Sequence, residues 1–179
     1  MTDKELLILI RAQLLAGLGR QGDTTTEVIA SHQPRSQGRV DGPALYVYKL
    51  MDHRYGWQHR KQEYDAESGD ISVTEKQYME TSFQVTALYP QDPADTTGPT
   101  ASDLASLAAM IVGSMTFGEA MKSQGAGVQR VMDILNPYFD NDRGQFEASP
   151  SFDFTVSHKR IMVDTAHAVD AAELNQTRV

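Results

Sequence analysis

Residues Tyr78–Met115 read YMETSFQVTALYPQDPADTTGPTASDLASLAAMIVGSM, and this stretch decides the fold. In its first third, apolar and polar side chains alternate, which predicts a strand with one face on the core and the other on water or a partner. An antiparallel sheet that is covered on one side follows from this alternation. The core-facing set is Met79, Thr81, Phe83, Val85, Ala87 and Tyr89.

A proline-rich break then separates this strand from a helix. Thr100 with Asp103, or Ser102 alone, can cap the N-terminus of that helix. From Leu104 to Met115 the apolar residues recur at helical spacing. We therefore expect this helix to cover the apolar face of the strand.

Two more helices are expected from capping boxes, in which Thr is followed three positions later by Glu. The first is a long N-terminal helix over Thr2–Ala16, which Gly17 and Gly19 would end. The second is a short helix over Thr116–Met121. Both helices add to the layer that covers the sheet.

The other strands are predicted from runs of β-branched and aromatic residues between turn signals. A turn at Tyr55-Gly56 is expected to separate two strands, and a second turn at Ser68-Gly69-Asp70 precedes the long strand. After Arg160 the pattern fades. The expected strands are a short one near Val28, then Ala44–Met51, Trp57–Tyr64, Ile71–Tyr89, Val128–Leu135 and a strand through Phe152–Val156.

These elements predict an α+β fold. Its centre is a mostly antiparallel β-sheet, with one long N-terminal helix and one or two helices packed on one face. Residues 1–160 are expected to form a single α+β domain, since 179 residues suit one core. Residues 161–179 are expected to form a flexible or partner-ordered C-terminal arm, because they are small and polar.

Composition limits the class of function. The formal net charge of −8 argues against a general nucleic-acid binder, which needs a basic surplus. The absence of cysteine excludes disulfides, thiolate metal sites and cysteine nucleophiles. The longest apolar run, Leu6–Ile10, is far shorter than a membrane span of about 20 residues. Acidic residues precede that run where a signal peptide has basic ones, so we expect an intracellular chain with no membrane partner.

Three patterns are similar to ligand sites, and each has a simpler structural interpretation. Gly17–Gly22 has the letters of a dinucleotide fingerprint, but a helix precedes it, which favours a helix end and a turn. Asp140–Gly144 with Glu147 is similar to a calcium loop with misplaced ligands, and an Asx-rich turn fits better. His53 and His59 could approach a metal only along one unbroken strand, but Gly56 lies between them, which favours an exposed pair on a hairpin.

No nucleophile elbow, Walker loop or zinc-protease helix is present in the sequence. We therefore expect no catalytic, cofactor-binding or metal residues, and not an enzyme. The segment His53–Lys61 (HRYGWQHRK) stands out instead as a basic patch interleaved with aromatic residues in an acidic chain. It could contact phosphates or an acidic partner, or its cations could pair with Glu63, Asp65, Glu67 and Asp70 across a hairpin. The candidate interface residues are Arg54, Tyr55, Trp57, His59, Arg60 and Lys61.

The order of these elements resembles that of the neck and tail-terminator (gateway) proteins of tailed bacteriophages. The resemblance covers residues 1–160, and two pieces carry most of it. One is the strand QVTALY (Gln84–Tyr89), which leads into the amphipathic helix. The other is the strand FDFTV (Phe152–Val156), which follows an acidic turn. No catalytic or ligand residue is carried over.

The resemblance implies a structural virion protein at the head-tail junction. It implies a homo-hexameric ring that terminates the tail tube and joins it to the head connector, with genomic DNA passing through the lumen. The implied partners are further copies of this chain, tail tube and sheath proteins, connector or collar proteins, and DNA bound without sequence specificity. Assembly in the host cytoplasm is implied, and no cofactor.

Two alternatives remain open at this point. A dodecameric head-completion or connector protein of the same particle would differ in stoichiometry and would equally lack an active site. A small ligand-binding domain or enzyme would instead have a concave polar pocket and would bind a small molecule saturably.

Overall fold

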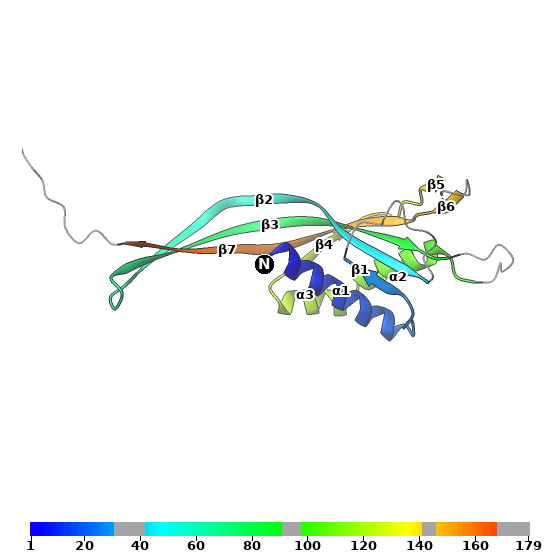
Figure 1. Cartoon of the computed structure of the whole chain (residues 1–179), viewed down its shortest axis with the longest axis horizontal. Coiled ribbons are helices and arrows are strands. Elements are labelled where there is room, and N and C mark those ends of the chain that lie inside the picture. Colours follow the sequence, from blue (N-terminus) through cyan, green and yellow to red (C-terminus); the bar gives the residue numbers. More distant parts are fainter. Residues whose placement is uncertain (31–41, 91–97, 141–145, 168–179) are drawn as a thin grey trace, which may run out of the picture.

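Three very long strands run side by side through the molecule, as Figure 1 shows in a computed structural model that describes residues 1–30, 42–90, 98–140 and 146–167. They are β2 (Ala44–Asp65), β3 (Asp70–Leu88) and β7 (Ser151–His167). β3 lies antiparallel between the other two, so β2 and β7 run in the same direction. The predicted alternation in β3 is confirmed, because Met79, Phe83 and Val85 are buried while Glu80 and Gln84 are partly exposed.

Two shorter strands complete the sheet, whose order is β1-β2-β3-β7-β4. β1 (Glu27–Ile29) pairs in parallel with the start of β2, and β4 (Gly127–Val131) pairs antiparallel with β7. β5 (Tyr138–Asp140) and β6 (Phe146–Ala148) form a separate hairpin. The mostly antiparallel α+β fold that the sequence predicts is therefore confirmed.

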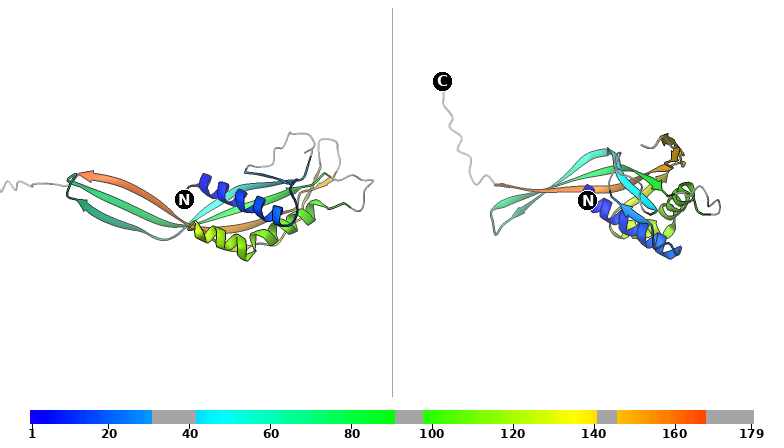
Figure 2. Two further views of the ribbon diagram at one scale, coloured as in Figure 1. Left: turned by 90° about the horizontal axis from the view of Figure 1, so that it is seen from below. Right: turned by 45° about the vertical axis from the view of Figure 1, so that its right-hand side comes forward.

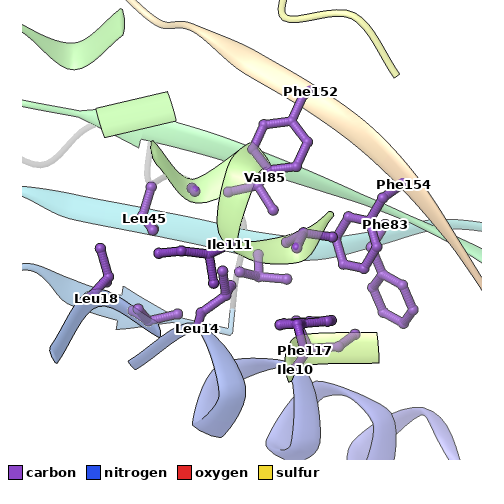
Figure 3. Close-up of a cluster of buried hydrophobic side chains, with 14 of the residues drawn as sticks. Ile10, Leu14, Leu18, Leu45, Phe83, Val85, Ile111, Phe117, Phe152 and Phe154 are labelled. Atoms are coloured by element: carbon purple, nitrogen blue, oxygen red, sulfur yellow. The ribbon is translucent and has the colours of Figure 1, made fainter. Parts of the chain in front are cut away.

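Three helices cover one face of the sheet, and only along half of its length (Figures 1 and 2). They are α1 (Asp3–Arg20), α2 (Ala101–Val112) and α3 (Met115–Ser123). The capping boxes of Thr2 with Glu5 and of Thr100 with Asp103 are both formed. Beneath the helices, side chains of the sheet and of all three helices fill one core (Figure 3). Its labelled members include Phe83, Phe152, Phe154, Ile10, Leu14, Ile111 and Phe117.

Two helix predictions were wrong in detail. α1 does not end at Gly17 and Gly19 but continues to Arg20. Gly17 is buried there, and a Cβ atom on it would lie 2.3 Å from Ile111 Cγ2, so the glycine lets α1 approach α2 closely. The cap of α3 is Ser114 rather than Thr116, since the Ser114 hydroxyl accepts from the Phe117 amide.

The predicted division into two strands at Tyr55-Gly56 was also wrong, because β2 is one strand. The turn was predicted because Gly56 is a glycine, and Gly56 does adopt the left-handed conformation common in turns, with a φ of 69°. The strand absorbs it as an irregularity between Tyr55 and His59, where β2 has two residues more than β3. A second irregularity places Leu50 opposite no partner.

The late strands also differ from expectation. β4 ends at Val131, and of the predicted continuation only Leu135 forms an isolated bridge, to Ser151. β7 continues past Arg160 to His167, so the flexible segment predicted for residues 161–179 begins inside a paired strand. Residues 168–179 lie outside the described part of the chain.

Within the described residues, no single helix has the length and apolar composition of a membrane span. Only α2 and α3 taken together have that length and composition, and the two helices are bent by 53° relative to each other.

Candidate assembly interface

The distal half of the three long strands extends beyond the helices, and we call this part, residues 51–79 and 158–167, the arm (Figures 1 and 2). Every residue of β2 from Leu50 to Asp65 is exposed. The core therefore ends where the arm begins, near the buried side chain of Met79. A thin ribbon of strands without a covered face has little to stabilise it in water.

Large apolar side chains lie exposed on both faces of the arm. Met162 lies on the face that continues the helix-covered side and is 56% exposed. Met162 of β7 and Arg60 of β2 both pair with Glu75 of β3, from opposite sides. The opposite face carries Ile161 and Val163, which are 53% and 66% exposed. Exposed apolar side chains in such numbers are typical of surfaces that bind other proteins.

The six residues selected from the sequence all lie in the exposed stretch of β2. Strand register divides them, since Arg54 and Arg60 lie on the helix side of the sheet, while Tyr55, His59 and Lys61 lie on the opposite side. Trp57 lies in the irregular stretch and is 97% exposed, more than any other large apolar side chain in the described residues. The six residues therefore share one strand but do not form a patch on a single face of the sheet.

The alternative interpretation of the basic patch, internal ion pairing, is partly confirmed. Lys61 pairs with Glu63, one of the expected partners. Arg60 pairs instead with Glu75 on β3, with 2.6 Å between Arg60 Nη2 and Glu75 Oε1. The Lys61–Glu63 pair is exposed and adds little stability. In the other pair the Glu75 side chain is only 11% exposed, but Arg60 remains 64% exposed, so both cations can still reach a partner.

Several surface residues of the arm were missed from the sequence because they come from β3 and β7. Lys159 lies beside Tyr78, with its Nζ atom 5.1 Å from the centre of the aromatic ring. Ile161, Met162 and Val163 are consecutive, so they place apolar groups on both faces. A run of three apolar residues at the expected end of a strand was the available signal.

At the junction of the arm with the body, a chain of polar contacts crosses the sheet. Lys49 Nζ lies 2.7 Å from Asp3 Oδ2 and also pairs with Asp52. Thr81 Oγ1 donates to Asp52 Oδ1 at 2.7 Å and lies 3.0 Å from Nε2 of the buried His158. These contacts tie α1, β2, β3 and β7 together where the core ends.

Burial affects the pKa values of Lys49, Asp52 and His158 in this network. It lowers the pKa of His158 below its ordinary value of 6.5, so the imidazole is neutral at neutral pH. Burial alone would raise the pKa of Asp52, but hydrogen bonds from Lys49 and Thr81 outweigh it and lower that pKa. His158 Nδ1 is buried and has no hydrogen-bond partner within the described residues.

The patterns similar to ligand sites gain no support from the structure. His53 and His59 do lie on one face of β2, but the described residues contain no cluster of three or more His, Asp or Glu side chains able to hold a metal. The calcium-like segment lies largely outside the described residues. A half-open hollow of about 360 Å³ lies at the root of the arm. It is lined by Tyr55, Tyr78, Met79, Glu80, Gln129 and Ser157.

Comparison with known proteins gives one family and one fold. A family model described as E217 gateway protein gp29 matches residues 5–168. No curated protein matches the chain. Among solved structures, the chain is similar to the sheath/tube terminator of an extracellular contractile injection system, PVC, in its extended state, with a TM-score of 0.52 and 12% identity. The match covers 100% of this chain and 64% of the length of that one. Because the identity is only 12%, the likeness shows a shared fold and nothing more.

Proposed function

Because the chain belongs to the E217 gateway protein gp29 family, we propose that it is a structural protein of a phage particle that forms a ring at the head-tail junction. The observation that carries this proposal is the arm, a long β-ribbon with exposed apolar side chains on both faces. Such a ribbon suits a protein whose work is assembly. The fold supports the same role, since it is shared with a sheath/tube terminator.

In this proposal the ring ends the tail tube and joins it to the head connector. One face of the ring matches the last subunits of the tube or sheath, and the other matches the connector or collar. Binding at these faces stops the addition of further tube subunits. The mechanism therefore rests on complementary surfaces and needs no reacting group.

Genomic DNA would pass through the lumen of the ring. The acidic charge of the chain, −8 per copy, suits this role because a negative wall repels phosphates and does not retain DNA in transit. We further propose six copies per ring, assembled in the host cytoplasm. In the proposal, the C-terminal end of the chain, including residues 168–179, takes part in docking.

Electron microscopy of particles made without this protein tests the function. The expected result is tails of uncontrolled length and heads that carry no tail, with normal particles restored when the protein is supplied from a second gene copy. A population of complete, infectious particles with tails of normal length would contradict the proposal. A version lacking residues 168–179 separates the role of that segment, because its full activity would remove the segment from the mechanism.

A further inference from the structure

The two outer edges of the arm have no strand beside them within the described residues. β1 pairs with β2 only at Ala44–Tyr46, and β4 pairs with β7 only as far as Ser157. Beyond these points each edge presents backbone amides and carbonyls that a further strand could bind. Neither β2 nor β7 contains a proline, and proline is a common protection of free edges.

The two free edges match each other in length and direction. On β3, Asp70–Lys76 is flanked without irregularity by His59–Asp65 of β2 and by Ile161–His167 of β7. The two flanking runs are thus of equal length. They also point the same way, from the body towards the tip of the arm.

The structure also identifies which backbone groups of β7 point away from β3. The Met132 amide donates to the Asp153 carbonyl, and Ser151 exchanges both of its backbone bonds with Leu135. Odd-numbered residues of β7 therefore face outward, and the pairing with β3 has no irregularity that would change this order. In the arm, the amides of Ile161 and Val163 consequently point to the free edge.

We propose that β7 of one copy pairs in parallel with β2 of a second copy along these two runs, which joins neighbouring arms into one continuous sheet. This inference rests on the proposed function, in which copies of the chain assemble side by side. A second copy is the occupant that the arm itself favours, because each copy offers both edges at the same height. Repeating the contact around a ring leaves neither outer edge of an arm unpaired along these runs.

Side chains are compatible with this register. With the arms at equal height, Arg60 lies beside Met162, Lys61 beside Val163, and Gln62 beside Asp164. No two like charges are opposite each other in the seven positions, so the pairing meets no direct repulsion. The exposed apolar side chains of Ile161, Met162 and Val163 would gain neighbours on both faces of the joined sheet.

A cysteine pair tests the register directly, because the chain contains no cysteine of its own. Lys61 and Val163 both pair with Thr74, so within one copy they are two strand spacings apart, about 10 Å. That distance is too long for a disulfide, whose Cα atoms lie within about 7 Å. The double variant K61C/V163C can therefore be bridged only between copies. Mild oxidation of the full chain should convert it into a covalent ladder that ends at the size of the closed ring.

The single variants are the matched controls. K61C mixed with V163C should give only dimers with one copy of each, while either variant alone should stay uncrosslinked. Dimers of V163C alone would indicate pairing of β7 with itself and would overturn the proposal. The same holds if V163C, assembled with tail tubes, is bridged to a cysteine placed in a tube or sheath protein and not to K61C.

A backbone variant gives a second readout. Val163→Pro removes an outward amide and leaves the bonds of β7 to β3 intact, and should weaken each contact between copies by roughly five-fold or more. Val163→Thr keeps the amide and should assemble normally. If the chain assembles but K61C/V163C forms no ladder, the pairing is wrong while the proposed ring stands. A chain that stays monomeric alone and at tube ends would refute both.

Discussion

At the scale of the single residue, Gly17 shows how one missing side chain sets the packing of the helix layer. It lies inside α1 and is buried against Ile111 of α2. From the sequence it was interpreted as the end of a helix, because a glycine near a helix end usually has that role. In the structure Gly17 is instead a close-packing position inside α1. The sequence could not show this, because Gly17 is buried by α2, a helix more than 80 positions away in the chain.

Gly17→Ala is therefore expected to destabilise the fold, although alanine favours helix formation. The new Cβ atom would lie 2.3 Å from Ile111 Cγ2, and overpacking of this kind costs about 1–3 kcal/mol. Gly19→Ala is the matched control, since nothing lies within 4 Å of its Cβ position and the change should stabilise α1 by up to about 1 kcal/mol. Urea unfolding of both variants measures the difference. Equal effects in the two would contradict the role assigned to Gly17.

His158 predicts a pH dependence of stability. Its pKa is lowered by burial, so below about pH 6.5 the unfolded chain takes up a proton that the folded chain still excludes. The free energy of unfolding should then be highest above that pH and fall as the pH falls through it, with a contribution of at most about 1.4 kcal/mol per pH unit from this residue.

The measurement compares urea unfolding at pH 7.5 and 5.5 for the natural chain and for His158→Gln. The natural chain should lose more stability between the two pH values than the variant. A natural chain and a His158→Gln variant with the same dependence would show that His158 is protonated in the folded state at the same pH as in the unfolded chain.

At the scale of the element, the sequence predicted the strands and helices better than their limits. Alternation in β3 and spacing in α2 were decisive because each element has one buried face. β2 was divided in two because Gly56 carries a turn signal, and only pairing with β3 shows that the strand continues through it. The candidate interface residues that the sequence indicated all lie in β2. The apolar residues of β7 were missed because they are distant in the chain and only the sheet brings them near β2.

Trp57 is expected to serve assembly and not folding. Its side chain is 97% exposed, so Trp57→Ser should change the free energy of unfolding by less than about 0.5 kcal/mol. Loss of a central tryptophan from an interface often costs about 2 kcal/mol, which is roughly a 30-fold weaker association.

Met110→Ser is the matched control for this prediction, because Met110 is 74% exposed on α2, away from the arm. Unfolding in urea and the dependence of native mass on protein concentration, measured for both variants, give the two readouts. Equal loss of association in both variants would remove the special role of Trp57.

At the scale of the whole molecule, the sheet has two parts. One half is covered by three helices and forms the core. The other half projects as the arm, which within the described residues has no helix over either face and no strand beside either outer edge. The sequence could predict the first half, since burial leaves a pattern in the chain. It predicted the second only in part, as strands at Trp57–Tyr64 and Ile71–Tyr89, because strands without a covered face leave no regular alternation that would show where they continue.

We propose that copies of this chain assemble into a ring at the end of a tail tube. The most direct test is the native mass of the purified protein, measured alone and then in the presence of tail tubes. We expect a hexamer, or a monomer that becomes hexameric only at tube ends. Twelve copies would contradict the six-fold ring, and a monomer that ignores tubes, sheath and connector alike would contradict the structural role itself.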